Sequence, residues 1–152
     1  MSFEQLRLNN QICFPIYVAS RLFVREYQPY LDALGITYPQ YLVLMVLWER
    51  DHLMVSEITE KLLLNTNTIT PLLKRMEGQE LITRQRSGND ERKVIVSLTV
   101  KGRNLEAGAA KIPEQFISGL LSASISVEDL KNLKDTLSIL IDQLSAEDTE
   151  IP

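Results

Sequence analysis

Cys13 is the only cysteine in the chain of 152 residues, and Tyr17, Tyr27, Tyr30 and Tyr38 follow it. A lone thiol cannot form a disulfide within the chain, so it is either inert apolar filling or a reactive centre. Phenolic hydroxyls stabilise a thiolate by hydrogen bonding, and the thiolate is the form that reacts with oxidants. These residue types indicate redox chemistry at a single thiol.

Other chemistries have little support. His52 is the only histidine, and its place near a predicted helix end makes it a surface or capping residue. The sequence has no cluster of metal ligands, no glycine-rich phosphate loop and no nucleophile–base motif. We therefore expect no metal, no cofactor and no enzymatic activity.

A second kind of chemistry is DNA recognition by a helix that starts near residue 66. Short polar side chains at an exposed helix start suit base edges and phosphates, and the helix dipole assists at phosphates. N-capping alone would account for one or two such residues, whereas four favour a helix-turn-helix. The four are Thr66, Asn67, Thr68 and Thr70, and the inward stripe of the same helix is Ile69, Leu72, Leu73 and Met76.

The segment after this helix changes from helical to alternating periodicity. Residues 81–86 and 93–98 read as two strands around the turn 87–90. A basic hairpin directly after a recognition helix is typical of a wing that places arginine in the minor groove. The basic residues that we expect at the DNA are Lys74 and Arg75 on the helix, and Arg84, Arg86 and Arg92 on the hairpin.

Charge is distributed unevenly along the chain. Residues 74–103 hold eight basic and four acidic residues, a net charge of +4, whereas the whole chain carries −4. A basic middle between acidic flanks is the local footprint that phosphate binding needs. A solvated charged face would produce the same count, so charge alone does not decide.

Helices are expected on both sides of this region. A capping-box pattern at 2–5 precedes a helix that runs to about residue 31, which Pro15 should kink beside Cys13. Thr37 caps a helix to about Arg50 that is apolar nearly all round and should be the central buried element. Ser56 is then expected to cap a short helix.

The end of the chain is predicted to be helical as well. Thr99 caps a helix toward Ala110, and Pro113 marks a bend or break. Ser126 starts a last helix with a wide leucine-rich stripe, which core packing explains in part and a second subunit would complete. The fold class is thus mainly α with a small β-wing, a winged helix-turn-helix with dimerisation helices at both ends.

Composition fits one globular domain. Apolar residues make up 45% and charged residues 24%, and no apolar stretch is long enough to span a bilayer. One cysteine and no export signal point to the cytoplasm, with no membrane partner.

Several motifs in these segments resemble the MarR family of winged-helix regulators over nearly the full length. Asp90-Glu91-Arg92, followed by Leu98-Thr99, is similar to the family's wing signature. Within the family the chain resembles the organic-hydroperoxide-sensing repressors of the OhrR type. The motifs that carry this likeness are Cys13-Phe14 with Tyr17, Ala19-Ser20-Arg21, Tyr38-Pro39-Gln40-Tyr41-Leu42, and Thr70-Pro71-Leu72-Leu73-Lys74-Arg75-Met76-Glu77.

The resemblance implies a homodimer on a palindromic operator in double-stranded DNA. One MarR-like domain would span 1–152, with dimerisation helices at 1–36 and 104–152 and a winged helix-turn-helix at 37–103. Cys13 matches the peroxidatic cysteine, and Tyr17, Tyr27 and Tyr38 match its tyrosine partners, some from the other subunit. Asp90 and Arg92 match the wing, and Thr66, Thr68 and Thr70 fall in the recognition helix.

The sequence departs from the family pattern in two places, which limits the family properties that can be assigned to this chain. Asn65 and Asn67 stand where relatives often have Asp and Gly, so the operator sequence does not follow. The absence of a second cysteine implies the one-cysteine subtype.

The expected mechanism is oxidation of Cys13 by an organic hydroperoxide, followed by release of the operator. The sulfenic acid product can condense with a small thiol, a backbone nitrogen or another Cys13. A mixed disulfide or overoxidation is expected to act more strongly than sulfenate alone.

Four alternatives remain open. Two are regulators of the same family: a broader redox or global regulator, and a repressor relieved by phenolic ligands with Cys13 as a bystander. The other two are a stand-alone thiol peroxidase and a protein-interaction module.

Overall fold

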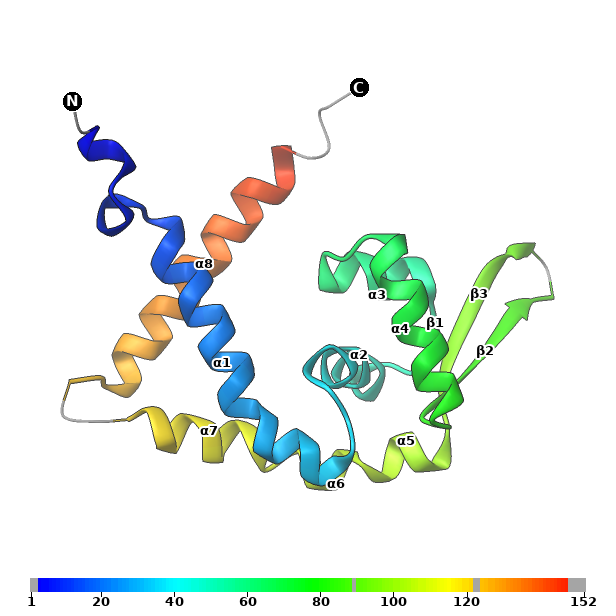
Figure 1. Cartoon of the computed structure of the whole chain (residues 1–152). Helices are drawn as coiled ribbons and strands as arrows, with labels where there is room; N and C mark the ends of the chain where they lie inside the picture. The colour runs from blue at the N-terminus through cyan, green and yellow to red at the C-terminus, as the bar shows by residue number, and fades with distance from the viewer. Residues whose placement is uncertain (1–2, 89, 122–123, 148–152) are drawn as a thin grey trace. The chain divides into compact units, whose positions relative to one another are not determined.

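The structure is a computed structural model that describes residues 3–88, 90–121 and 124–147, without the side chains of 90–92 and 147. The chain divides into two compact units, Met1–Ile112 and Pro113–Pro152, each of which is described by itself. The elements of the chain, shown in Figure 1, are η1 (Glu4–Leu6), η2 (Leu8–Asn10), α1 (Cys13–Leu34), α2 (Tyr38–Glu49), β1 (Leu53–Met54), α3 (Val55–Leu62), α4 (Thr66–Gly78), β2 (Ile82–Ser87), β3 (Asp90–Leu98), α5 (Val100–Asn104), α6 (Glu106–Ala109), α7 (Ile112–Leu120) and α8 (Val127–Glu147).

Helix α1 begins later than the sequence predicted. The segment before it forms two short 3₁₀ turns, and Cys13 is the first helical residue. The expected kink at Pro15 is therefore wrong, because Pro15 lies in the first turn, where a helix needs no N–H donor. Ser2 of the expected capping box lies outside the described residues. The helix ends at Leu34 and is capped by Gly35, whose φ of 69° is the left-handed conformation typical of a C-terminal cap.

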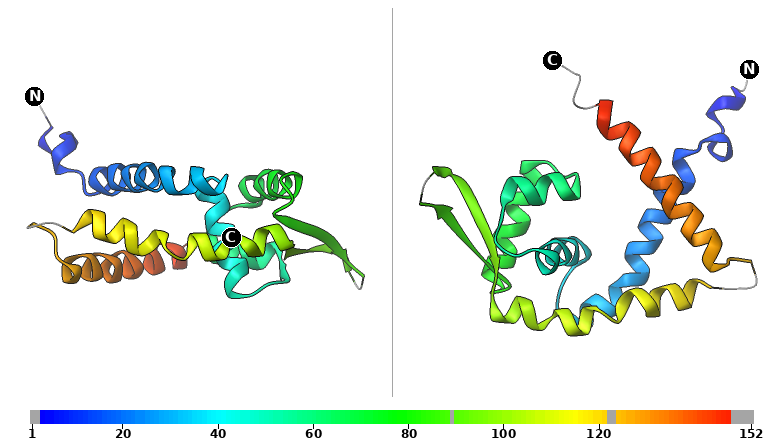
Figure 2. Two further views of the ribbon diagram at one scale, coloured as in Figure 1. Left: turned by 90° about the horizontal axis from the view of Figure 1, so that it is seen from below. Right: turned by 180° about the vertical axis from the view of Figure 1, so that it is seen from behind.

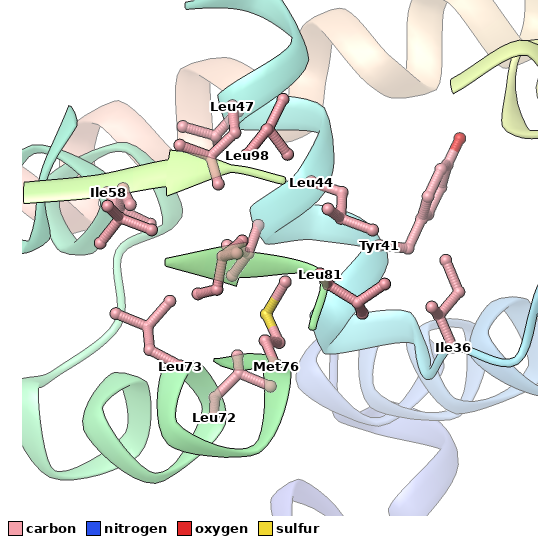
Figure 3. Packing of buried hydrophobic residues seen from close by; sticks show 14 of the residues in the cluster. Ile36, Tyr41, Leu44, Leu47, Ile58, Leu72, Leu73, Met76, Leu81 and Leu98 are labelled. Atoms are coloured by element: carbon pink, nitrogen blue, oxygen red, sulfur yellow. The ribbon is translucent and has the colours of Figure 1, made fainter. Parts of the chain in front are cut away.

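Helix α2 is the central buried element of the first unit, as predicted. Thr37 begins it with a capping box, in which the Thr37 N–H donates to Gln40 Oε1 at 2.9 Å. Leu44 and Leu47 are fully buried. Figure 3 shows them converging with Ile58 and residues of α4 and the strands into one core.

The helix-turn-helix is formed by α3 and α4. The expected Ser56 cap is wrong, because Ser56 is the second residue of α3, and it is the Glu57 carboxylate that accepts the Met54 N–H at 2.8 Å. The inward stripe of α4 is confirmed: its four predicted apolar residues are at most 4% exposed, namely Ile69, Leu72, Leu73 and Met76.

The wing is part of a three-stranded antiparallel sheet with the order β1-β3-β2. The predicted hairpin is confirmed, with Ile82 opposite Leu98 and Arg84 opposite Val96. Figures 1 and 2 show this hairpin projecting from the helical part of the first unit. Strand β1 was not predicted from the sequence, and it consists of two residues.

The predicted helix after the wing is interrupted. Thr99 caps α5 as expected, and its Oγ1 accepts the Gly102 N–H at 3.0 Å. The chain then forms α5 and α6 with Leu105 between them. Gly102 is required by close packing, because a Cβ there would lie 2.1 Å from the Leu81 carbonyl oxygen.

The second unit comprises the rest of α7 and the whole of α8. Pro113 lies in the first turn of α7, so the predicted break falls just before it. The Ser126 Oγ accepts the Asp129 N–H at 3.1 Å and the Asp129 carboxylate accepts the Ser126 N–H at 2.8 Å, which confirms the predicted start of α8. The leucine-rich stripe of α8 leaves several large apolar side chains exposed, among them Leu133, Ile139, Leu140, Ile141 and Leu144.

Across the part of the chain that the structure describes, no single helix has the length and apolar composition to cross a membrane. α1 and α2 meet that criterion only together, as a pair bent by 71°.

Candidate functional site

The start of α4 presents polar side chains to solvent, and the opposite face of this helix is packed in the core. Asn65 is the N-cap, and its Oδ1 accepts the Thr68 N–H and the Thr68 hydroxyl, both at 2.9 Å. Thr66, Asn67 and Thr68 are exposed, and Thr70 is half-buried. The cap thus fixes the first turn, while the apolar stripe anchors the opposite face in the core.

Three of the predicted basic residues are exposed. Lys74 and Arg75 continue the outer face of α4, and Arg86 lies near the end of β2. The side chains of Asp90 and Arg92, which were expected at the wing, lie outside the described residues. The described cations therefore follow the recognition helix and reach onto the hairpin that succeeds it.

Arg84, the fourth predicted basic residue, is bound within the chain. Its Nε and Nη2 donate to Glu77 Oε2 at 3.0 and 2.6 Å, and its backbone N–H donates to Glu77 Oε1 at 3.1 Å. The hydrogen bonds from the Arg84 side chain outweigh partial burial and hold the pKa of Glu77 below its usual range. This carboxylate therefore joins the end of α4 to β2.

The base of the wing is held by Asp51, just after α2. Its carboxylate accepts the His52 N–H at 2.8 Å and the Leu98 N–H at 2.9 Å, and it pairs with Arg103 of α5. Burial alone would raise the pKa of Asp51, but these hydrogen bonds and the nearby charges of His52 and Arg103 lower it. His52 Nδ1 lies 2.7 Å from the Ser97 hydroxyl, so this residue belongs to the same network.

Cys13 is exposed at the first position of α1. Tyr17 follows one turn later and is 59% exposed, with the Arg21 guanidinium 5.6 Å from the centre of its ring. Thiol and phenol therefore share one face of the same helix, because residues four apart are neighbours on a helix.

The other tyrosines gather elsewhere. The Tyr27 and Tyr38 rings lie 5.2 Å apart, edge to face, and Tyr41 lies 6.1 and 6.2 Å from them. Tyr27 is fourteen residues beyond Cys13 on the same helix, about 21 Å along its axis. Within one chain the structure therefore brings Tyr27 and Tyr38 together, but not with Cys13.

Burial sets the protonation of this tyrosine cluster, which consists of Tyr27, Tyr38 and Tyr41. Burial, with contributions from Tyr38 and Tyr41, raises the pKa of Tyr27 to about 12. Burial also raises the pKa of Tyr38, and burial and Tyr38 raise that of Tyr41. These phenols remain hydrogen-bond donors at neutral pH.

Sequence reasoning missed Glu77 and Asp51 as organisers of this region, and it assigned Gln40 only to the capping box of α2. Gln40 is only 3% exposed, and its Nε2 donates to Gln79 Oε1 at 2.6 Å, which ties the start of α2 to the end of the recognition helix. The sequence does contain a signal for Gln40, because a glutamine within an otherwise apolar helix needs a polar partner if the helix is buried. The Glu77–Arg84 pair leaves no such signal, because it crosses from a helix to a strand.

The described residues contain no group of three or more His, Cys, Asp or Glu side chains arranged to hold a metal ion.

A family model and the sequences of known proteins both show that the chain is similar to bacterial transcriptional regulators. A family model described as "Transcriptional regulator SarA/Rot" matches residues 25–108. The organic hydroperoxide resistance transcriptional regulator of Bacillus subtilis is 49% identical over 142 residues, which cover 93% of this chain and 95% of that protein.

The chain is also similar to solved structures of a DNA-bound protein, AbfR. Overoxidised AbfR bound to DNA is 37% identical, with a TM-score of 0.74 over 93% of this chain and 97% of that one. Reduced AbfR bound to DNA is 39% identical, with a TM-score of 0.70 over 91% and 98% of the two chains. AbfR is a protein of Staphylococcus epidermidis.

Proposed function

Since the chain belongs to the MarR family of winged-helix transcriptional regulators, we propose that it is a DNA-binding repressor that senses organic hydroperoxides through Cys13. The observation that carries the proposal is the 49% identity, over 93% of the chain, to an organic hydroperoxide resistance regulator. It acts as a regulator rather than as an enzyme. Its place is the cytoplasm, where thiols stay reduced.

DNA binding is supported by the outer face of α4 and by the hairpin that follows. The recognition helix would enter the major groove with Thr66, Asn67, Thr68 and Thr70 toward the bases. Lys74, Arg75 and Arg86 would meet phosphates, and Arg92 would extend the wing into the minor groove. AbfR, a relative with the same fold, is bound to DNA in two solved structures.

A second copy of the chain completes the assembly. The exposed apolar face of α8 needs cover, and two recognition helices would read the two halves of a palindrome about 34 Å apart. The distance between Cys13 and the tyrosine cluster supports the same conclusion. Tyr27 and Tyr38 can serve Cys13 only if they come from the partner, whereas Tyr17 can serve it from the same chain.

The proposed reaction is a two-electron oxidation. The Cys13 thiolate attacks the O–O bond of the hydroperoxide, the bond breaks, an alcohol leaves, and the sulfur becomes a sulfenic acid. A small thiol, or Cys13 of another copy, then displaces water and forms a disulfide. Since AbfR is bound to DNA in its overoxidised form as well as its reduced form, we assign release to the disulfide rather than to overoxidation.

The free energy needed to release the operator is large for the modification of one residue. Changing operator occupancy from 99:1 to 1:99 takes a shift of about 5.5 kcal/mol. In the proposed dimer, a disulfide adduct at Cys13 would supply it by disrupting packing between the two subunits.

The test is fluorescence anisotropy with the promoter upstream of the protein's own gene, before and after cumene hydroperoxide plus a small thiol. We expect wild type to bind when reduced and to dissociate after treatment, and Cys13→Ser to stay bound. If both proteins dissociate, Cys13 is not the sensor. If neither does, a small-molecule ligand becomes the better hypothesis.

A further inference from the structure

Glu77 occupies a position that a helix normally disfavours for a carboxylate. It is the penultimate residue of α4, where the helix dipole is negative and an acidic side chain is destabilising. Arg84 offsets this cost with three donors, two from its guanidinium and one from its backbone. A carboxylate maintained at a helix C-terminus by a partner on another element indicates a specific role for the pair.

The backbone contact shows what the carboxylate does to the sheet. Strand β2 lies at the edge of the sheet, and within the described part of the chain it pairs with β3 alone. The N–H of an edge residue has no strand partner on its outer side, and Glu77 Oε1 accepts the one that Arg84 donates. The same carboxylate thus attaches both the backbone and the side chain of β2 to the recognition helix.

The Glu77–Arg84 contact affects where the hairpin, and with it Arg86, lies relative to the recognition helix. α4 and β2 are separated by only three residues, and Glu80 in this connection has a φ of 60°. The Glu77–Arg84 pair spans this bend, with Glu77 before it and Arg84 after it, and fixes the direction in which the hairpin leaves the helix. Arg86 is two residues further along β2 and therefore on the same face as Arg84, but it is exposed.

We propose that Glu77 and Arg84 are positioning residues for DNA binding. Their ion pair fixes the hairpin against the recognition helix, so that Arg86 meets the DNA, while neither member of the pair contacts it. Arg84 is consistent with this role because its side chain is 22% exposed and its guanidinium already binds Glu77. The inference rests on the proposed function.

The neutralising variant Glu77→Gln distinguishes positioning from simple electrostatics by the sign of its effect. Removing an acidic group beside DNA normally strengthens binding, because it removes repulsion from phosphates. If Glu77 positions the wing, Glu77→Gln instead weakens operator binding, by about 5- to 30-fold. Glu80→Gln removes a nearby charge without touching the pair and is the matched control, expected to bind as well as wild type or better.

Arg84→Lys separates the pair from a phosphate contact. Lysine keeps the charge that a phosphate would need but loses the planar fork that holds Glu77. We expect a loss similar to that of Glu77→Gln, and a double variant no weaker than either single one. The salt dependence of binding should keep the wild-type slope in all three, whereas Arg86→Ala should lower the slope by about one.

The assay is anisotropy on the operator at several salt concentrations. Urea unfolding of each variant, repeated at several temperatures, identifies an assay temperature at which all variants are fully folded dimers. Glu77→Gln that binds as tightly as wild type, or Arg84→Lys that keeps its affinity, overturns the inference and leaves the proposed function intact. Wild-type protein that binds no operator overturns both.

Discussion

Three residues other than glycine have a positive φ among the described residues: His52, Leu63 and Glu80. Leu63 follows α3 in the turn of the helix-turn-helix, at a φ of 51°, and its side chain is 61% exposed. The left-handed conformation costs a side-chain-bearing residue about 1–2 kcal/mol. Little apolar burial offsets that strain, so the turn stores it.

Leu63→Gly is therefore expected to stabilise the protein. Relief of the strain should raise the free energy of unfolding by about 1 kcal/mol and the melting temperature by about 2–4 °C. Leu63→Ala is the matched control, because alanine keeps the Cβ that causes the strain. Thermal unfolding followed by circular dichroism measures both, and equal stabilisation by Ala and Gly would contradict the explanation.

Asp51 gives a prediction with a pH dependence. Its side chain is only 15% exposed and accepts two backbone N–H groups, so Asp51→Asn should lower the free energy of unfolding at pH 7 by about 1–3 kcal/mol. Because the folded-state pKa is lowered, the contribution of the carboxylate is present above the ordinary pKa of an aspartate. It is lost as pH falls through the lowered pKa.

Urea unfolding at pH 7 and near pH 3 measures this effect. The difference between wild type and Asp51→Asn should shrink at the lower pH. Asp135→Asn, on the exposed surface of α8, should match wild type at both values. A difference that stays constant would show that shape, not charge, explains the role of Asp51.

At the scale of elements, the recognition helix depends on its cap. Asn65→Ala removes the acceptor of the Thr68 N–H and hydroxyl, and should cost about 1 kcal/mol of stability. The first turn would fray, so operator affinity should fall as well. Hydrogen exchange at the Thr68 amide reports the fraying directly.

Asn65→Asp is the control, because a carboxylate can cap the same amide. It should keep the stability and the slow exchange of wild type. If Asn65→Ala exchanges at Thr68 as slowly as wild type, the cap is not what fixes this turn.

The sequence predicted the elements whose periodicity is strong and whose ends are marked. Helices α2 and α4 and the hairpin fall in this class: Thr37 was predicted as the cap of α2, and α4 was predicted to start near residue 66. Strand β1 was missed because Leu53-Met54 is too short to alternate. The start of α1 was placed too early because the capping-box pattern at residues 2–5 was taken as the helix start, which made Pro15 an interior residue, whereas the helix begins at Cys13.

The chemistry was predictable in kind but not in arrangement. A lone Cys13 with nearby tyrosines indicated redox chemistry, but a linear sequence does not separate tyrosines of the same chain from those of a partner. Likewise Arg84 was read as a DNA contact on its charge, because its partner Glu77 lies on a different element. Pairs that join two different elements depend on packing and leave no periodic signal.

At the scale of the whole molecule, we expect the exposed apolar face of α8 to form the dimer interface. Replacing Ile141 and Leu144 by glutamate should convert the dimer to monomer, because two buried charges would then face apolar surface. Sedimentation velocity measures the change. Asn132→Glu, an exposed polar position of α8, is the control, and a double variant that remains dimeric would place the interface elsewhere.

The packing of Trp48 gives the molecule an internal optical reporter. It is the only tryptophan of the chain, its indole N–H donates to the Gly102 carbonyl at 3.1 Å, and its ring lies 6.3 Å from Tyr41. Light absorbed by the tyrosine cluster is therefore passed to one fixed acceptor beside the base of the wing. Any rearrangement that separates α2 from α5 changes both the wavelength and the yield of this emission, so the proposed response to peroxide can be followed in unlabelled protein.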